Sequence, residues 1–492
     1  MKKVWKYIII SLLLLLGLGC VGVLYLFFVP GSSLFNITYI NNKIYKTVEQ
    51  NPASVEQIIL NSRAYDVKIV STTEEKIEVK AYSNSFGFVT VSNNKFDITA
   101  ELERSVLTVN VIEPYGFATD NASYVELKIP AQKDISITLN NLKAKTLIDD
   151  SNIYINNFKY KTKKGDIEIK KGSISGNMNF DLNRAKCTIS KDVQTPDQET
   201  TKEVNIKLTK GKFLASNSAF SDINILYNER GVITIGECYN IRENQKTAGG
   251  SISINKVAHA NITAGDTIVK IGEIENSAIM DLKSSGSISI ETLKGDSSLS
   301  TNSGNIYVGK STSTISLYSE SGNIYLPNAY LAVIVKVGYG EATIKFAEDA
   351  ANTSENSSSR VLHAIVKNGK LTASGVHKIG TATNDTSEII DGGVRITGNG
   401  RVNLKMDTVI GNNTIKANNG IATVVVNKSS VYTLNTSSQG GKIRVNLTQI
   451  PEYNGYTTKE ERTTLVNGSS GSDSLTATTK YGYLTVLDTN FA

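Results

Sequence analysis

The segment Ser285-Gly286-Ser287-Ile288-Ser289-Ile290 is followed 18 residues later by Ser303-Gly304-Asn305-Ile306-Tyr307-Val308, and again by Ser321-Gly322-Asn323-Ile324-Tyr325-Leu326. Within each copy, aliphatic residues alternate with serine, asparagine or tyrosine, which is the period of a strand with one buried face. A fixed spacing indicates that each copy is one coil of a β-solenoid, because stacked coils bury an aliphatic column that one coil cannot bury alone. The glycine of each copy is expected at a corner where a positive φ is easily adopted.

Alternating segments of this kind also lie on both sides of the repeat, as in 125–129 and 441–445. No stretch beyond residue 29 shows a convincing helical period. The sequence therefore predicts an all-β fold, an elongated β-solenoid or β-helix-like repeat domain with one N-terminal transmembrane α-helix. The predicted parts are a cytoplasmic stub (1–6), a transmembrane helix (7–29), a linker (30–54), an N-terminal β-strand region (55–145), β-solenoid repeats (146–346) and an irregular continuation of the β-repeat domain (347–492).

The membrane helix is predicted from an uncharged run over residues 7–29 that contains five consecutive leucines. At roughly 1.5 Å per residue, about 23 residues span a hydrocarbon core of about 30 Å. Lys2, Lys3 and Lys6 precede this run, so the positive-inside rule keeps the N-terminus cytoplasmic. The expected location is the cell membrane, single-pass, with the C-terminal bulk extracytoplasmic. A cleaved signal and a lipid anchor at Cys20 are disfavoured because the apolar run is long and continues past Cys20.

Composition excludes several classes of protein. A net charge of +6 over 492 residues gives no case for nucleic-acid binding, and 3 cysteines exclude a disulfide-dense scaffold. His259, His363 and His377 fall at no metal-ligand spacing with any cysteine, so we expect no metal and no cofactor. Cys187 and Cys238 lie where the predicted location permits a disulfide, and the sequence leaves open whether they pair.

The acidic residues do not form the pair that sugar hydrolysis needs. Glycoside hydrolysis uses two carboxylates that face a common sugar. The adjacent acids at 74–75 and 149–150 would point to opposite faces of a strand. Asp166 and Glu168 could share a face, but lysines surround them, so ion pairing explains them better. We therefore expect no enzymatic activity.

Two sets of side chains are candidate ligand contacts. Lys159, Lys161 and Lys163 alternate, so one strand face carries all three. They could attract an anionic wall polymer or lipid surface, or they could only keep a strand face solvated. Tyr307 and Tyr325 hold the same place in successive coils and could form a platform for sugar rings or protein ligands. Stacking for stability alone is the alternative.

The Ile129-Pro130 pair, followed by repeated Ser-Gly-Asn-Ile-x-Val units, resembles the bacterial "putative adhesin" β-strand repeat family over about residues 55 to 345. Members of that family are envelope proteins, often tied to a membrane helix, whose molecular activity is mostly unassigned. The resemblance implies a β-solenoid-like, cell-surface module. It supplies no catalytic residues to transfer to this chain.

These observations together predict a membrane-anchored cell-surface protein with a structural or adhesive, non-catalytic role at the cell envelope. The expected partners are the membrane and a cell-wall polymer, glycan or surface protein, and no nucleic acid. One alternative is an envelope-stress or signalling scaffold that acts through a membrane partner. The other is a carbohydrate-active β-helix enzyme.

Overall fold

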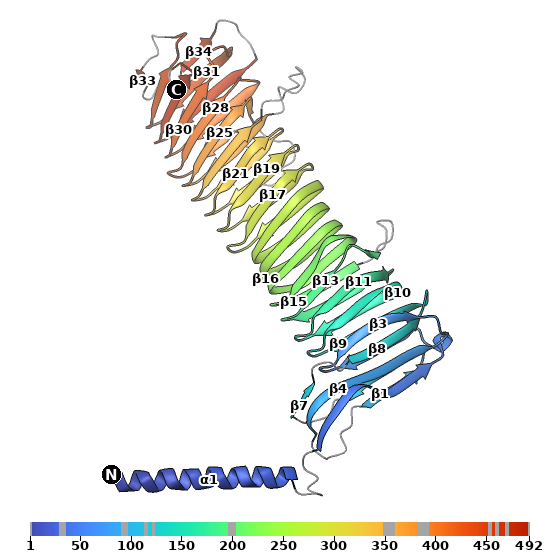
Figure 1. The fold of residues 1–492 in the computed structure, drawn as a ribbon. Coiled ribbons are helices and arrows are strands. Elements are labelled where there is room, and N and C mark those ends of the chain that lie inside the picture. Colours follow the sequence, from blue (N-terminus) through green and yellow to red (C-terminus); the bar gives the residue numbers. More distant parts are fainter. Residues whose placement is uncertain are drawn as a thin grey trace. The chain divides into compact units, whose positions relative to one another are not determined.

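The computed structural model describes residues 2–28, 36–89, 97–112, 117–120, 124–194, 203–347, 360–380, 393–450, 455–457, 462–467 and 472–490. The chain divides into two compact units, Met1–Gln194 (unit 1) and Thr195–Ala492 (unit 2). Strands make up nearly all of the regular structure in both units (Figure 1). The all-β prediction, made from the alternation of aliphatic and polar residues, is thereby confirmed.

Unit 1 begins with helix α1 (Lys2–Phe28). The prediction of a single-pass membrane segment over 7–29 is wrong: within the described ranges, no helix is both long and apolar enough to cross a membrane. The predicted cell-membrane location, with an extracytoplasmic C-terminal bulk, is contradicted by the same finding.

The remaining elements of unit 1 are strands and one short 3-10 turn. They are β1 (Asn36–Gln50), η1 (Pro52–Ser54), β2 (Gln57–Ser62), β3 (Asp66–Thr72), β4 (Ile77–Val89), β5 (Asp97–Glu103), β6 (Val106–Ile112), β7 (Phe117–Asp120), β8 (Tyr124–Pro130), β9 (Asp134–Asn141), β10 (Thr146–Thr162), β11 (Ile167–Ile174), β12 (Met178–Asn183), β13 (Lys186–Ile189) and β14 (Val193–Gln194). Strand β1 lies inside the predicted linker 30–54 and pairs with β4.

Most strands of unit 1 pair in parallel, as stacked coils require. One ladder runs through β6, β2, β9, β10 and β12, with its core residues in register. Those residues are at most 1% exposed: Leu107, Ile58, Ile137, Phe158 and Met178. Antiparallel strands then cover one end, since β5 pairs with β6 and β4 pairs with β8. Covering an end in this way discourages edge-to-edge pairing with other chains.

Unit 2 continues as strands to the C-terminal end of the described chain. They are β15 (Glu203–Thr209), β16 (Lys212–Leu282), β17 (Ser287–Leu293), β18 (Ser297–Thr301), β19 (Ile306–Ser311), β20 (Ile315–Ser319), β21 (Ile324–Ala329), β22 (Val333–Val337), β23 (Glu341–Phe346), β24 (Val361–Val366), β25 (Lys370–Val376), β26 (Lys378–Ile379), β27 (Val394–Ile396), β28 (Arg401–Met406), β29 (Asn412–Ala417), β30 (Ile421–Val426), β31 (Tyr432–Ser438), β32 (Lys442–Asn446), β33 (Gly455–Thr457), β34 (Arg462–Val466), β35 (Ser474–Thr479) and β36 (Tyr483–Asp488).

The three quoted repeats form successive coils of unit 2. Ile288 pairs with Ile306, and Ile306 pairs with Ile324, on the parallel strands β17, β19 and β21 (Figure 1). All three isoleucines are at most 2% exposed, which confirms the predicted aliphatic column. Burying each such side chain contributes about 1.5–3 kcal/mol. The column continues, in register and buried, through Ala342, Leu371, Val402, Ala422, Leu484 and Ile443.

The glycines of the repeats are needed for a reason other than the one expected from the sequence. A positive φ is absent at Gly286, Gly304 and Gly322, although they are described residues. Instead, a Cβ on Gly304 would lie 1.6 Å from the carbonyl oxygen of Gly286, and one on Gly322 would lie 1.8 Å from that of Gly304. Successive corners therefore approach so closely that only hydrogen fits between them. The same crowding recurs at Gly340, Gly369, Gly420, Gly482 and Gly441, and we call the whole set the glycine spine.

The coils at the end of unit 2 do not stack in chain order. Strand β30 pairs with β36 rather than β32, and β36 pairs in turn with β32. On the opposite sheet, β35 likewise lies between β29 and β31. The last coil, β35–β36, is therefore inserted between two coils that precede it in sequence. Antiparallel strands β34 and β33 pair with β31 and β32, respectively.

Glu243 interrupts the apolar interior of unit 2. It takes the inward position two residues after Ile241 in β16 and is 2% exposed. Neither of its carboxylate oxygens has a hydrogen-bond partner. Burial raises the pKa of Glu243 from 4.5 to about 8. Between those values the folded chain holds a proton that the unfolded chain has lost, so stability falls as the pH rises toward 8.

We expect a pH increase from 5 to 8 to lower the free energy of unfolding by about 4 kcal/mol through Glu243 alone. Glu243→Gln cannot ionise and should remove that share of the pH dependence. Urea unfolding at both pH values measures the difference between the two proteins. Glu237→Gln, at an exposed position of the same strand, is the matched control. An unchanged pH dependence in Glu243→Gln would contradict the buried placement.

Candidate functional site

Five neighbouring strands of unit 1 carry polar side chains at one register position. In spatial order they are Asn110 (β6), Asn61 (β2), Asn140 (β9), Lys161 (β10) and Asp181 (β12). The Nδ2 of Asn140 donates to Oδ1 of Asn61 at 2.8 Å, and the Nδ2 of Asn61 donates to Oδ1 of Asn110 at 2.7 Å. We call these five residues the polar ladder. Its order follows from parallel pairing, which places equivalent residues of successive coils side by side.

A groove of about 750 Å³ runs along the polar ladder. Arg63, just after β2, and Lys163, just after β10, add positive charge to its lining. Of the three lysines singled out in the sequence, Lys161 and Lys163 line the groove. Lys159 lies on the same exposed strand face but outside the lining. The complete lining is Asn61, Ser62, Arg63, Asn110, Val111, Asn140, Asn141, Leu142, Lys161, Thr162, Lys163, Asp181 and Asn183.

The cations of the groove are not used by the fold as ion-pair partners. Arg63, Lys161 and Lys163 are exposed, and none has a carboxylate oxygen of the described chain within 4.0 Å. Asp181 is in register with Lys161 on the neighbouring strand, yet the two form no ion pair at that distance. The groove therefore presents three positive charges and one negative charge to solvent.

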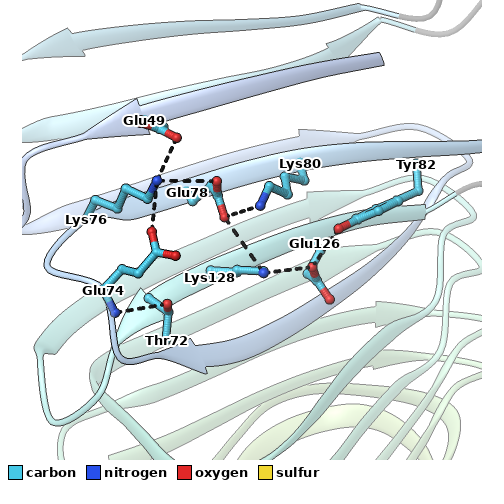
Figure 2. A network of polar contacts seen from close by, with 9 residues as sticks. All are labelled: Glu49, Thr72, Glu74, Lys76, Glu78, Lys80, Tyr82, Glu126 and Lys128. Carbon is cyan, nitrogen blue, oxygen red and sulfur yellow. Dashed lines mark hydrogen bonds and ion pairs between the residues drawn. The ribbon is translucent and has the colours of Figure 1, made fainter. Parts of the chain in front are cut away.

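Some other lysines of unit 1 are engaged in ion pairs, as Figure 2 shows for the region of strands β4 and β8. The Nζ of Lys76 lies 2.8 Å from Glu49 and 2.9 Å from Glu74. Glu78, whose side chain is 7% exposed, lies 2.6 Å from Lys80. Because these lysines neutralise neighbouring carboxylates, they stabilise the covering strands and are not free to bind a ligand.

The contacts of this network shift the pKa of three of its members, Lys76, Glu74 and Tyr82. Hydrogen bonds with Glu49 and Glu74 raise the pKa of Lys76, and the hydrogen bond with Lys76 lowers the pKa of Glu74. Burial, followed by the charge of Glu126, raises the pKa of Tyr82 to about 12. The Tyr82 hydroxyl donates to Glu126 at 3.2 Å (Figure 2). Lys76 and Glu74 therefore stay charged, and Tyr82 stays neutral, throughout the physiological range.

The two tyrosines singled out in the sequence lie together on unit 2. Tyr307 and Tyr325 are paired residues of β19 and β21, and their rings stack with centroids 5.7 Å apart at 18°. They are 42% and 47% exposed, so a face of the pair is open to solvent. Ser289 and Thr343 flank them at the same register position on the next strands. The tyrosine pair and the groove belong to different units and are separate candidate sites.

The acidic residues weighed for sugar hydrolysis are held by local contacts. Asp150 accepts hydrogen bonds from the backbone and hydroxyl of Ser71 at 2.8 and 2.7 Å. Asp166 accepts from the backbone N–H of Lys186 at 2.8 Å. Glu168 lies 4.0 Å from Lys170. Each of these carboxylates therefore has a structural partner.

None of the cysteines and histidines lines the groove. Cys187 and Cys238 are both buried free thiols, and burial raises the pKa of each. His259 contacts the hydroxyl of Ser277 at 2.8 Å. Over the described ranges, no three side chains of histidine, cysteine, aspartate or glutamate come together in a way that could hold a metal ion.

Sequence reasoning found the groove lysines but missed the asparagines. Each asparagine ends a segment of the same form, Ile58-Ile59-Leu60-Asn61, Leu107-Thr108-Val109-Asn110 and Ile137-Thr138-Leu139-Asn140. That shared ending was the sequence signal that could have identified the asparagines of the polar ladder. It could not be used without knowing that these segments are neighbours, because they lie 49 and 30 residues apart in the chain.

Comparisons with known proteins identify the family to which the repeat domain belongs. None of the curated proteins matches the chain. One solved structure, described as a "putative cell adhesion protein" from Clostridium sporogenes, aligns with 91% of this chain and 100% of its own, at 8% identity and a TM-score of 0.14. So low a score carries no structural argument. The family model for Toastrack DUF4097 matches residues 55–373. The chain therefore belongs to the Toastrack DUF4097 family, which confirms the adhesin-like β-repeat resemblance seen in its sequence.

Proposed function

We propose that this protein has a structural or adhesive, non-catalytic role and holds an extended partner along the side chains of its stacked coils. A wall polymer, a glycan or a surface protein would be such a partner. The polar ladder is the observation that supports this proposal. Parallel coils repeat a side-chain position about every 4.8 Å, so a partner with its own repeat can be contacted several times in succession.

The tyrosine pair is a second proposed contact. Tyr307 and Tyr325 keep more than two fifths of their surface exposed although they stack on each other. Exposed aromatic rings supply large contact areas with few rotatable bonds, which suits them to binding surfaces. Sugar hydrolysis is less favoured because Asp150, Asp166 and Glu168 are engaged by neighbouring groups.

Binding of the purified full chain to immobilised neutral glycans, anionic glycans and proteins tests the proposal. We expect saturable binding to at least one class, with no release of new reducing ends from any glycan. Absence of binding to every class would contradict a binding role. Release of reducing ends would instead favour the carbohydrate-active enzyme.

A further inference from the structure

We infer that the groove along the polar ladder binds an anionic linear glycan, a sugar polymer that carries carboxylate or phosphate groups. This inference rests on the proposed binding function and names its site and ligand. Charge is the first argument. Arg63, Lys161 and Lys163 face one acid, Asp181, and none of the three is ion-paired within the described chain. A positively lined groove attracts anions and raises their local concentration.

The hydrogen-bonding groups of the groove favour hydroxyl-rich ligands. Within the chain of asparagine hydrogen bonds, Asn110 accepts through Oδ1 and Asn140 donates through Nδ2. This leaves the Nδ2 of Asn110 as a donor and the Oδ1 of Asn140 as an acceptor, one at each end of the row of three asparagines. A ligand hydroxyl both donates and accepts, so it can satisfy such a mixture.

The lining also distinguishes sugars from single-stranded nucleic acids. It contains asparagine, serine, threonine, lysine, arginine, aspartate and two aliphatic residues, but no aromatic residue. Proteins that bind single-stranded nucleic acids combine positive charge with aromatic rings on which bases stack. The groove has the charge without the stacking surface. It therefore fits a charged polymer whose units are recognised by hydrogen bonds.

The spacing of the strands sets the length of ligand that can be held. The polar ladder crosses five neighbouring strands, β6, β2, β9, β10 and β12. Four steps of about 4.8 Å give a contact line of roughly 19 Å. A single sugar would touch only part of that line. Short oligomers are therefore expected to bind more weakly than a polymer that covers all five strands.

The test measures affinity of the full chain for polygalacturonate, a linear phosphomannan, fully methyl-esterified polygalacturonate and single-stranded poly(U). The first two carry charge on carboxylate and phosphate groups, respectively, and the third removes the charge from the first. We expect binding to at least one of the first two, weakened by added salt, and at least tenfold weaker binding of the esterified polymer and poly(U).

Lys161→Glu/Lys163→Glu should lower affinity for the bound polyanion at least tenfold, while Lys161→Arg/Lys163→Arg should retain it. Lys143→Glu/Lys191→Glu changes the net charge equally at exposed positions outside the groove and should change affinity less than twofold. Urea midpoints of all variants verify folding. Equal affinity of wild type and Lys161→Glu/Lys163→Glu, or preference for the esterified polymer or poly(U), would overturn the inference. Binding only to a protein or neutral glycan would overturn it and leave the proposed function standing, whereas no binding to any class would contradict both.

Discussion

Removing residues 472–492 should detach strands β31 and β32 from unit 2, although both strands remain in the chain. Strand β31 pairs with β34 and β35, and β32 pairs with β33 and β36. Deletion of the last coil therefore leaves each strand with one antiparallel neighbour and no coil beneath it. The loss also removes Leu475, Ala477, Leu484 and Val486, all at most 1% exposed, from the core.

Hydrogen exchange measured by mass spectrometry tests this expectation. Protection of residues 432–446 should be lost in the truncated protein, while that of β19 and β21 is retained. If the coils stacked in chain order, β31 and β32 would keep their contacts with β29 and β30, and protection would persist. That result would contradict the inserted coil.

A peptide of residues 472–490 provides the matched control for truncation. Added in trans, it should restore protection at 432–446 because it supplies both missing strands. The same peptide with Leu475→Asp and Leu484→Asp should not, since these leucines are 0% and 1% exposed in the core. Equal rescue by both peptides would show that the inward positions are misassigned.

Gly304→Ala should destabilise unit 2 by at least about 3 kcal/mol, at the upper end of the usual range for overpacking. The added methyl carbon would lie 1.6 Å from the carbonyl oxygen of Gly286 and 2.5 Å from its carbonyl carbon. Both are backbone atoms, so no side-chain rotation relieves the clash. Neighbouring coils would have to separate, which weakens the ladder hydrogen bonds around them.

Gly249→Ala is the control for this substitution. The nearest heavy atom to its added carbon is Cβ of Asp266 at 3.7 Å, an ordinary van der Waals distance, and its φ is not positive. Replacing glycine where the backbone suits alanine is neutral or stabilises by about 0.4–1 kcal/mol. Urea unfolding followed by circular dichroism compares the two variants. Similar midpoints for Gly304→Ala and Gly249→Ala would contradict the glycine spine.

The repeat was predictable from sequence because each coil carries its own period. The alternation around Ile288, Ile306 and Ile324 identifies the buried face, and the 18-residue spacing identifies the stacking partner. The requirement for glycine was also visible, but its cause was not. A corner with positive φ and a corner with a close backbone neighbour both select glycine, and only coordinates distinguish them.

The order of the last coils could not be predicted for a related reason. Gly482-Tyr483-Leu484-Thr485-Val486 has the same local pattern as Gly441-Lys442-Ile443-Arg444-Val445. Such a pattern predicts a coil but does not say which coil it contacts. Pairing between coils is decided by the whole path of the chain.

The lysines of the candidate site could be predicted from the sequence, but their neighbours on other coils could not. Alternation placed Lys159, Lys161 and Lys163 on one exposed face, which the structure bears out. Their neighbours across the ladder, Asn140 and Asp181, come from separate coils and could be assigned only from the register. The membrane helix predicted over 7–29 is an error of the opposite kind, because apolar composition alone led to a membrane assignment that the structure contradicts.

Disulfide cross-linking between coils is the most direct test of whether successive coils stack on one another. Ser298 and Ser316 are paired residues on the parallel strands β18 and β20, and neither is buried. Adjacent strands lie about 4.8 Å apart, within the Cα range of a disulfide, whereas strands two coils apart do not. Mild oxidation of Ser298→Cys/Ser316→Cys should form the bond rapidly, and Ser298→Cys/Ile334→Cys, two coils apart, should not. Equal cross-linking of both pairs, or none in the first, would contradict the stacking of successive coils.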